Sequence, residues 1–222
     1  MVHVAIDITA LARNRFGGIA RVCAATAREL SRHSGFSVTA YWSKGDRPDL
    51  APPVCLKRIG IMPRLLSPSV DIAHSLCHRM LRIRSRYHLY SVHDAWSLHP
   101  NSYQSDEFQR KLGHRLRRNM ERADIIVTGS EWSKSELIRL GAVEGDRCHV
   151  IPDGVDIPQD ISASDILIRH KLKRHEYALF VGRLEFRKNL GHIVAAVKAH
   201  PPLKLVCIGE PGFGYEESAT PA

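Results

Sequence analysis

Short apolar segments alternate along the chain with longer segments in which apolar and polar positions recur at helical spacing. Each short segment is rich in Val, Ile and Tyr and is bounded by turn residues, which is typical of buried strands. The segments that predict strands in the first two thirds of the chain are residues 2–8, 36–42, 54–59, 70–75, 87–94, 124–130 and 148–154.

The segments between these strands predict helices. Residues 18–32 have an alanine-rich face, and a shorter helix at 134–140 is preceded by a possible capping box of Ser133 and Glu136. Residues 105–122 carry an apolar stripe at every fourth position, formed by Phe108, Leu112, Leu116 and Met120. The alternation of elements, together with uninterrupted apolar runs such as "DIIVT", indicates parallel strands covered on both faces. A complete, doubly wound, Rossmann-like α/β domain is therefore predicted over residues 1–156.

The pattern changes after this domain. Residues 157–176 are polar and include Pro158, which indicates a linker with a short helix. A strand at 177–182, a helix at 189–199 and a strand at 203–208 then begin a second domain, 177–222. One β-α-β unit cannot bury both faces of its sheet, so we expect this second Rossmann-like domain to be only partial in this chain.

Composition narrows the protein class. With 222 residues, 44% of them hydrophobic and 25% charged, the chain is expected to be globular. No apolar run approaches the roughly 18 residues needed to span a bilayer, and the N-terminus has no basic leader typical of a signal peptide. The 5 cysteines form no C-x-x-C pair, which argues against disulfides and zinc knuckles and favours a cytoplasmic protein with most thiols in the core. His74 and His78 lie four residues apart, but H-E-x-x-H is absent, so no metal site is expected.

Positive charge is concentrated in one region. The net charge is +9, and the stretch 79–122 holds ten Lys and Arg residues against four acidic ones, or +6. This concentration indicates either an anionic ligand or surface, or a solvated helix face. Nucleic acid is not expected as the partner, because aromatic residues are not interleaved with the cations.

Two cations, Arg183 and Lys188, stand where a predicted strand leads into a helix. A helix N-terminus is already positive, so extra cations there are favourable only beside an anion. The tract "GEPGFG" lacks the dinucleotide-binding spacing, and there is no P-loop motif and no D-x-D pair for a metal-bound diphosphate. Arg and Lys would then neutralise a diphosphate directly. The pair Gly17–Gly18, between the first strand and helix, would let a ligand approach the backbone.

Several segments resemble a known family. "YALFVGRLEFRKNL" is similar to the motif that opens the C-terminal domain of the family-4 retaining glycosyltransferases (glycosyl transferases group 1), which have the GT-B fold. "IDITALARNRFGGIARV", "SVHDAWSLHPNSY", "RADIIVTGSEWSKSELIRLG" and "HVIPDGVD" resemble consecutive segments of bacterial members. The resemblance covers almost the whole chain in the family's order. It implies a hexosyltransferase of polysaccharide biosynthesis that transfers a sugar from a nucleotide sugar to a glycan or lipid-linked acceptor, with retention and without a metal or other cofactor.

The resemblance also implies roles for individual residues. Arg183, Lys188, Gly17 and Gly18 would contact the donor diphosphate. His93 would lie beside the transferred sugar and Asp94 beside the acceptor, both as catalytic residues, and Ser130 and Glu131 would form the cleft wall. Structural alternatives stay open. His93 could be a strand-end histidine, Asp94 a turn former, and Ser130 with Glu131 a helix N-cap.

The chain also departs from the family pattern. Asp153 replaces a usual Asn, and the family's E-x7-E motif is not found, since Glu216 and Glu217 come too early to form it. One expectation is therefore a C-terminally truncated enzyme that is inactive alone and is completed by a separately encoded C-terminal half. The other is a catalytically dead acceptor- or anion-binding module. The basic helix 105–122 would suit an anionic membrane at the inner face, where lipid-linked acceptors reside.

Overall fold

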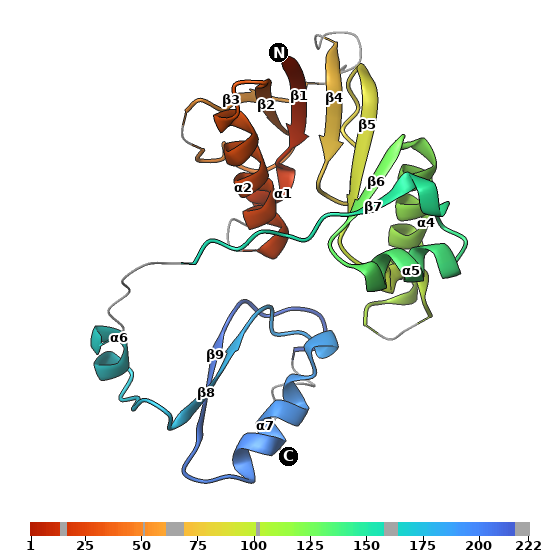
Figure 1. The fold of residues 1–222 in the computed structure, drawn as a ribbon. Helices are drawn as coiled ribbons and strands as arrows, with labels where there is room; N and C mark the ends of the chain where they lie inside the picture. The colour runs from red at the N-terminus through yellow and green to blue at the C-terminus, as the bar shows by residue number, and fades with distance from the viewer. Residues whose placement is uncertain (14–16, 51, 61–68, 101–102, 158–163, 216–222) are drawn as a thin grey trace. The chain divides into compact units, whose positions relative to one another are not determined.

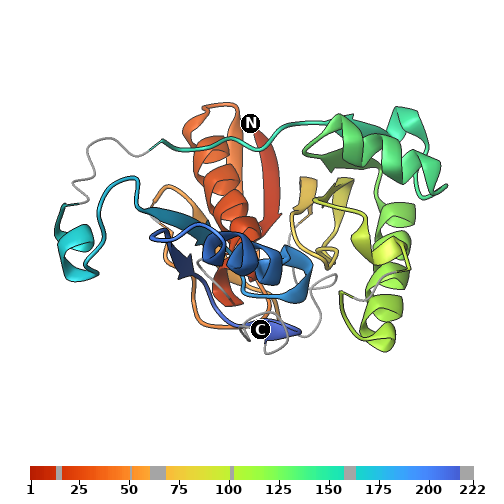
Figure 2. The same ribbon diagram turned by 90° about the horizontal axis from the view of Figure 1, so that it is seen from below.

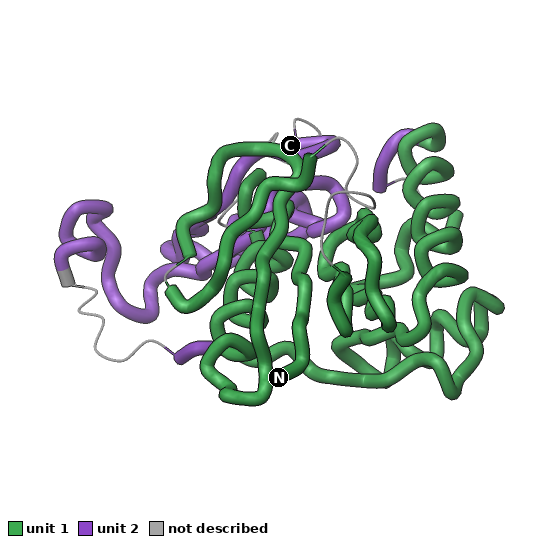
Figure 3. The backbone as a smooth tube through the Cα atoms, turned by 90° about the horizontal axis from the view of Figure 1, so that it is seen from above, with its two compact units in different colours: residues 1–100, 106–155 green, residues 101–105, 156–222 purple. Residues whose placement is uncertain are grey.

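The computed structural model describes residues 1–13, 17–50, 52–60, 69–100, 103–157 and 164–215. The chain divides into two compact units, which are coloured separately in Figure 3. Unit 1 comprises residues 1–100 and 106–155, and unit 2 comprises residues 101–105 and 156–222.

The described part of unit 1 is built on a seven-stranded sheet in the order β3-β2-β1-β4-β5-β6-β7, and every neighbouring pair is parallel (Figure 1). Its strands are β1 (Val2–Asp7), β2 (Phe36–Trp42), β3 (Cys55–Arg58), β4 (Val70–Ser75), β5 (Ser85–Val92), β6 (Ile125–Thr128) and β7 (Cys148–Val150). The chain first moves outward from β1 to β3 and then crosses to the other side of β1. This reversal is the topology of a doubly wound nucleotide-binding fold, as the alternating pattern predicted.

The helices of unit 1 are α1 (Thr9–Arg13), α2 (Gly18–Arg32), α4 (Asp106–Arg122) and α5 (Glu131–Arg139), with single turns η1 (Trp96–Leu98) and η2 (Gly145–Arg147). The alanine-rich face of α2 is confirmed, because Ala20, Cys23 and Ala27 are buried. In α4 the stripe holds for Leu112, Leu116 and Met120. Phe108 is 50% exposed, so its place in the buried stripe is wrong. Figure 2 shows α2 and α4 from below, each alongside its part of the sheet.

The core of unit 1 is divided between the two halves of the sheet. One cluster joins β1 and β2 to α2, with Ile6, Ala27 and Ala40 fully buried. A second joins β5 and β6 to α4 and α5, with Tyr90 and Ile126 at its centre. Small residues on α2 let this helix lie close to its strands, whereas α4 and α5 together pack the other half of the sheet.

Unit 2 contains α6 (Ser164–Arg169), β8 (Tyr177–Val181), η3 (Phe186–Lys188), α7 (Leu190–Lys198) and β9 (Lys204–Ile208). Strands β8 and β9 are parallel and pair in register from Tyr177 with Lys204 to Val181 with Ile208. Three apolar side chains of this small sheet remain largely exposed: Leu179 at 54%, Val181 at 69% and Ile208 at 55%. The described sheet of unit 2 is thus covered much less than that of unit 1.

Some local predictions are wrong. Helix α5 begins at Glu131 rather than 134, and its N-cap is Ser130, whose Oγ accepts a hydrogen bond from Ser133 N at 3.1 Å. Glu136 instead pairs with Arg139 and His99.

The cysteine and histidine predictions also need correction. Cys23 and Cys148 are buried as expected, but Cys55 and Cys207 are exposed, because each lies in a strand at the end of its described sheet. His74 belongs to β4 and His78 follows it, so the two histidines do not share a helix. Among the described helices, none has the length and hydropathy needed to cross a bilayer.

Candidate functional site

The carboxyl ends of the parallel strands form one edge of the unit 1 sheet. At this edge Asp7 of β1 pairs with Ser75 of β4, and Ser75 pairs with Tyr90 of β5. Doubly wound sheets bind ligands at this edge, at the point where the strand order reverses. In unit 1 that point lies between β1 and β4. The residues predicted as sites follow strands of this edge: Gly17 and Gly18 precede α2, His93 and Asp94 follow β5, and Ser130 and Glu131 follow β6.

His93 is fixed by a backbone contact. Its Nε2 lies 2.9 Å from the carbonyl oxygen of Leu76. Since a carbonyl can only accept, Nε2 must carry the proton and Nδ1 is the nitrogen left for other contacts. The contact joins the ends of β4 and β5, so His93 has a structural partner whatever further role it takes. Asp94, the next residue, is exposed.

A second histidine lies beneath this edge. His74 of β4 is 2.9 Å from Ser91 Oγ through its Nε2. Burial, reinforced by the neighbouring His93, lowers the pKa of His74 to about 4. His74 is therefore neutral at physiological pH and acts as a packed polar link between β4 and β5.

Gly17 and Gly18 open helix α2. Gly17 is its N-cap in an extended conformation and makes no side-chain cap. A Cβ added to Gly18 would meet no atom within 4 Å, so packing within the described protein does not demand glycine there. Open space beside the free N–H groups of a helix start is suited to an anionic ligand.

Ser130 and Glu131 begin helix α5. Besides capping Ser133 N, Ser130 lies 3.0 Å from Ser133 Oγ, and Glu131 stands in the first turn, where its charge matches the helix dipole. Both residues thus have the structural role left open by the sequence. Their position at the carboxyl edge is also compatible with a cleft wall.

Sequence reasoning missed Asp7, which is 3% exposed at the end of β1. Its Oδ1 accepts hydrogen bonds from Thr9 N at 2.9 Å and Thr9 Oγ1 at 2.6 Å. Burial raises the pKa of Asp7, while the Thr9 hydrogen bonds and nearby Arg79 oppose the rise. Asp7 anchors the start of α1, and only its place at the end of an apolar strand could have signalled this.

In unit 2 the path of the backbone depends on close approach between two loops. The pairing of β8 and β9 continues beyond the strands, from Leu184 N to Glu210 O at 2.9 Å and from Gly212 N to Leu184 O at 2.7 Å. A Cβ on Gly209 would lie 1.8 Å from the Gly182 carbonyl oxygen, and one on Gly212 would lie 2.9 Å from Glu185 Cβ. The glycines of "GEPGFG" therefore allow this contact and do not form a dinucleotide-binding turn.

This arrangement places Arg183 directly after β8 and Lys188 just before α7. Both side chains are exposed. Within the part of the chain that the structure describes, neither forms an ion pair or side-chain hydrogen bond. The acidic residue between them, Glu185, is buried and pairs with Arg187 at 2.6 Å.

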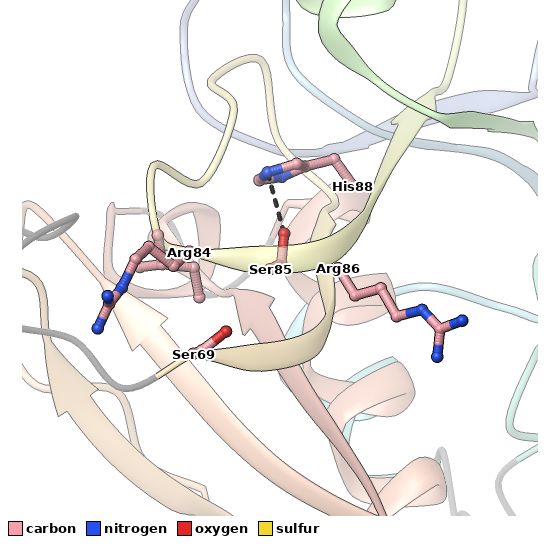
Figure 4. Close-up of a pocket in the computed structure, with 6 residues that line it drawn as sticks. Ser69, Arg84, Ser85, Arg86 and His88 are labelled. Carbon is pink, nitrogen blue, oxygen red and sulfur yellow. Dashed lines mark hydrogen bonds between the residues drawn. The ribbon is translucent and has the colours of Figure 1, made fainter.

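An open hollow of about 550 Å³ lies elsewhere in unit 1. It is lined by Ser69 and by residues at the start of β5, and Figure 4 shows Arg84 and Arg86 extending to opposite sides of it. Ser85 Oγ lies 2.9 Å from His88 Nε2. The hollow is at the amino ends of β4 and β5, opposite the edge that carries the predicted site residues, so we do not assign it to that site. Among the described residues, no three or more His, Cys, Asp and Glu side chains are gathered as metal ligands.

Comparison with known proteins identifies relatives of this architecture. Residues 69–159 match the family "Glycosyltransferase Family 4". The chain is 26% identical over 132 residues to O-antigen chain mannosyltransferase B of Escherichia coli, which covers 57% of this chain and 33% of that protein.

Solved structures share the fold. Anabaena HepE in complex with UDP-glucose matches with a TM-score of 0.66 at 13% identity, over 98% of this chain and 63% of that one. Sucrose-phosphate synthase from Thermosynechococcus elongatus matches with a TM-score of 0.63 at 18% identity, over 94% of this chain and 62% of that one. This chain thus spans a third of the curated relative and less than two thirds of these structures. The family match over residues 69–159 and the 26% identical relative support the predicted resemblance to the family-4 glycosyltransferases, and the solved structures show that the chain shares their fold.

Proposed function

We propose that this chain takes part in the transfer of a sugar from a nucleotide-sugar donor to a glycan or lipid-linked acceptor. In this proposal unit 1 supplies the acceptor side, with His93 and Asp94 near the reacting sugar. Unit 2 supplies Arg183 and Lys188 to the donor diphosphate. The name of the E. coli relative favours mannose as the sugar, and the HepE complex shows a fold of this type with UDP-glucose.

The observation that carries the proposal is that Arg183 and Lys188 pair with no acidic side chain among the residues that the structure describes. The segment 183–188 holds three cations and one acidic residue, Glu185, and among the described residues only Arg187 pairs with Glu185. Both remaining cations precede α7, and Lys188 lies two residues before its first residue, where the helix dipole makes a positive charge unfavourable. A bound diphosphate would remove this repulsion and accept charge-assisted hydrogen bonds from both.

Retention of configuration and independence from a metal are parts of the same proposal. A diphosphate leaving group gains negative charge as the glycosidic bond breaks, and Arg with Lys can stabilise that charge in place of a divalent ion. We also propose that the chain does not turn over alone, because the expected donor contacts in the described part of unit 2 are limited to these two cations.

Pyrophosphate binding tests the donor assignment. Calorimetric titration of the full chain should detect weak binding, and Arg183→Ala/Lys188→Ala should weaken it at least tenfold, since each charge-assisted contact contributes about 1–2 kcal/mol. The matched control is Arg169→Ala/Arg174→Ala, which removes two exposed cations from the same unit outside the motif. Equal affinity in all three proteins would show that Arg183 and Lys188 are not the diphosphate ligands.

A membrane contact through α4 is the second part of the proposal. Four exposed basic residues recur at every fourth position of α4: Arg110, His114, Arg118 and Arg122. They are offset by two positions from the buried residues Leu112, Leu116 and Met120. The offset places them on the opposite face of the helix. A cationic outer face suits an anionic membrane that holds a lipid-linked acceptor.

A further inference from the structure

Cationic side chains of three segments act electrostatically on the loop that follows β4 and on the end of β1 beside it. This loop contains His78 and Arg79, and two further arginines come from other elements: Arg13 is the last residue of α1, and Arg115 belongs to α4. All four side chains are exposed and belong to unit 1. We call these residues, Arg13, His78, Arg79 and Arg115, the His78 cluster.

Two hydrogen bonds hold the loop in place. Leu76 accepts from His93, and the His78 carbonyl accepts from Asn119 Nδ2 at 3.2 Å. Asn119 also lies 3.2 Å from the Tyr90 hydroxyl through the same nitrogen. Since Arg115 stands one turn before Asn119 on α4, its side chain leaves the helix on the same side, toward the loop.

The electrostatics agree with this placement. The pKa of His78 is lowered, first by partial desolvation among its neighbours, although the ring keeps an exposed surface. Asp94 raises the pKa of His78, whereas His93, Arg115 and Arg13 lower it. Arg79 acts from the same loop on buried Asp7.

The cluster has too few acidic partners of its own. Within the described residues, Arg13, Arg79 and Arg115 make no ion pair or side-chain hydrogen bond with a carboxylate. Asp94 and the buried Asp7 are the acidic groups that act on the cluster in the described structure. Three guanidinium groups from three segments thus act on the same end of the sheet with few carboxylates to offset their charge, and a bound anion would offset it.

We propose that the His78 cluster binds an anionic group of the acceptor, a phosphate ester or a carboxylate, next to His93 and Asp94. This inference rests on the proposed function, because that function makes unit 1 the acceptor side. Planar guanidinium groups bind both kinds of oxyanion in a bidentate manner, and their arrangement around His78 would orient the acceptor beside the reacting sugar. The acceptor is thus an acidic glycan or a phosphate-linked lipid glycan rather than a neutral sugar.

The donor diphosphate is another source of the same chemistry, and inorganic phosphate can separate the two. In the full chain, the NMR signal of the His78 ring, assigned by its loss in His78→Gln, should shift on phosphate addition. A bound anion should also raise the pKa of His78, because it favours the charged imidazole.

Three double variants locate the binding site. Arg13→Ala/Arg115→Ala should weaken the phosphate-induced shift at least tenfold in affinity. Arg84→Ala/Arg86→Ala, which removes two arginines from the opposite edge of the same sheet, should leave it unchanged. Arg183→Ala/Lys188→Ala should also leave it unchanged while losing pyrophosphate binding, so the acceptor inference and the donor assignment can fail separately.

Two outcomes would overturn the inference. If phosphate leaves the His78 signal and its pKa unmoved in the parent protein, the cluster is not an anion site. If the shift persists in Arg13→Ala/Arg115→Ala, other groups hold the anion at His78. If the shift disappears in Arg183→Ala/Lys188→Ala, the anion belongs to the donor site. Preserved signals of the remaining histidines would show that each variant is folded.

Discussion

Unit 1 should lose stability when the pH falls from 7 to 5, and His74 should be a principal cause. Burial and the adjacent His93 lower the pKa of His74 from 6.5 to about 4 in the folded protein. In the unfolded chain the imidazole returns to its ordinary pKa. Between these two values the unfolded state binds a proton that the folded state does not, so stability is lost as the pH falls through this window.

The size of the effect follows from the two pKa values. For a group that titrates near 6.5 when unfolded and near 4 when folded, the loss between pH 7 and pH 5 is about 2 kcal/mol. Two other groups also contribute. The lowered pKa of His78 acts in the same direction, whereas the raised pKa of Asp7 favours the folded state as the pH falls.

Urea unfolding followed by tryptophan fluorescence can measure this loss. The 3 tryptophans, Trp42, Trp96 and Trp132, all belong to unit 1, so the signal reports that unit and not unit 2. His74→Gln keeps a polar partner for Ser91 but removes the titrating ring. His149→Gln, at an exposed position of β7, is the matched control.

Comparing the parent with His74→Gln isolates the contribution of His74 to the loss of stability, because the other titratable groups of unit 1 are the same in both proteins. The parent and His149→Gln should lose the same free energy of unfolding between pH 7 and pH 5, and His74→Gln should lose about 2 kcal/mol less. If all three proteins show the same loss, the buried, neutral state of His74 is not what makes unit 1 sensitive to acid.

Two further predictions concern unit 2 and helix α4. Gly209→Ala places a Cβ 1.8 Å from the Gly182 carbonyl oxygen, so it should destabilise unit 2 by about 1–3 kcal/mol. Hydrogen exchange should become faster in β8 and β9, while tryptophan fluorescence stays unchanged. Unchanged exchange would contradict the close approach. The full chain should sediment with anionic liposomes at low salt and be released as the salt concentration rises. The variant Arg110→Glu/Arg118→Glu should sediment less. Equal binding to neutral and anionic liposomes would exclude this electrostatic contact.

Most of the fold could be predicted from hydrophobic periodicity. Residues 18–32, 36–42 and 70–75 form the predicted elements with the predicted bounds, because in each of them the spacing of apolar residues directly reports which face is buried. The bounds were less certain where a strand ends in polar residues. The segment 148–154 shortens to Cys148–Val150, since the apolar pattern does not show where pairing with β6 stops.

Local polar contacts could not be predicted as well. Ser130 and Ser133 both stand near the start of the same helix, and either could have capped it. The choice depends on the end of β6, which turns the chain into an extended conformation at Ser130, and Ser133 then becomes the residue whose N–H is capped. The side chain of Phe108 posed a similar problem, because helical spacing gives its face but not how far along α4 the core extends.

The proposed site residues show the same difference between a local motif and contacts that depend on the fold. Arg183 and Lys188 can be proposed as diphosphate ligands from the sequence alone, because a short motif contains both cations and lies where a strand leads into a helix. The His78 cluster could not, because Arg13, Arg79 and Arg115 come from three segments that are brought together only by the order of β1, β4 and β5 and by the packing of α4.

The two groups of cations have one physical feature in common, which explains why both are assigned to ligands. In unit 2 the acidic residue between Arg183 and Lys188, Glu185, is buried and paired with Arg187, and neither of the two flanking cations forms an ion pair within the described residues. In unit 1 the buried acid on which Arg79 acts, Asp7, accepts hydrogen bonds from Thr9. In both places a buried carboxylate that could have neutralised the exposed cations is already satisfied within the fold. Cations held near a strand end without such a partner reduce the stability of the protein alone, and a bound anion reverses that cost.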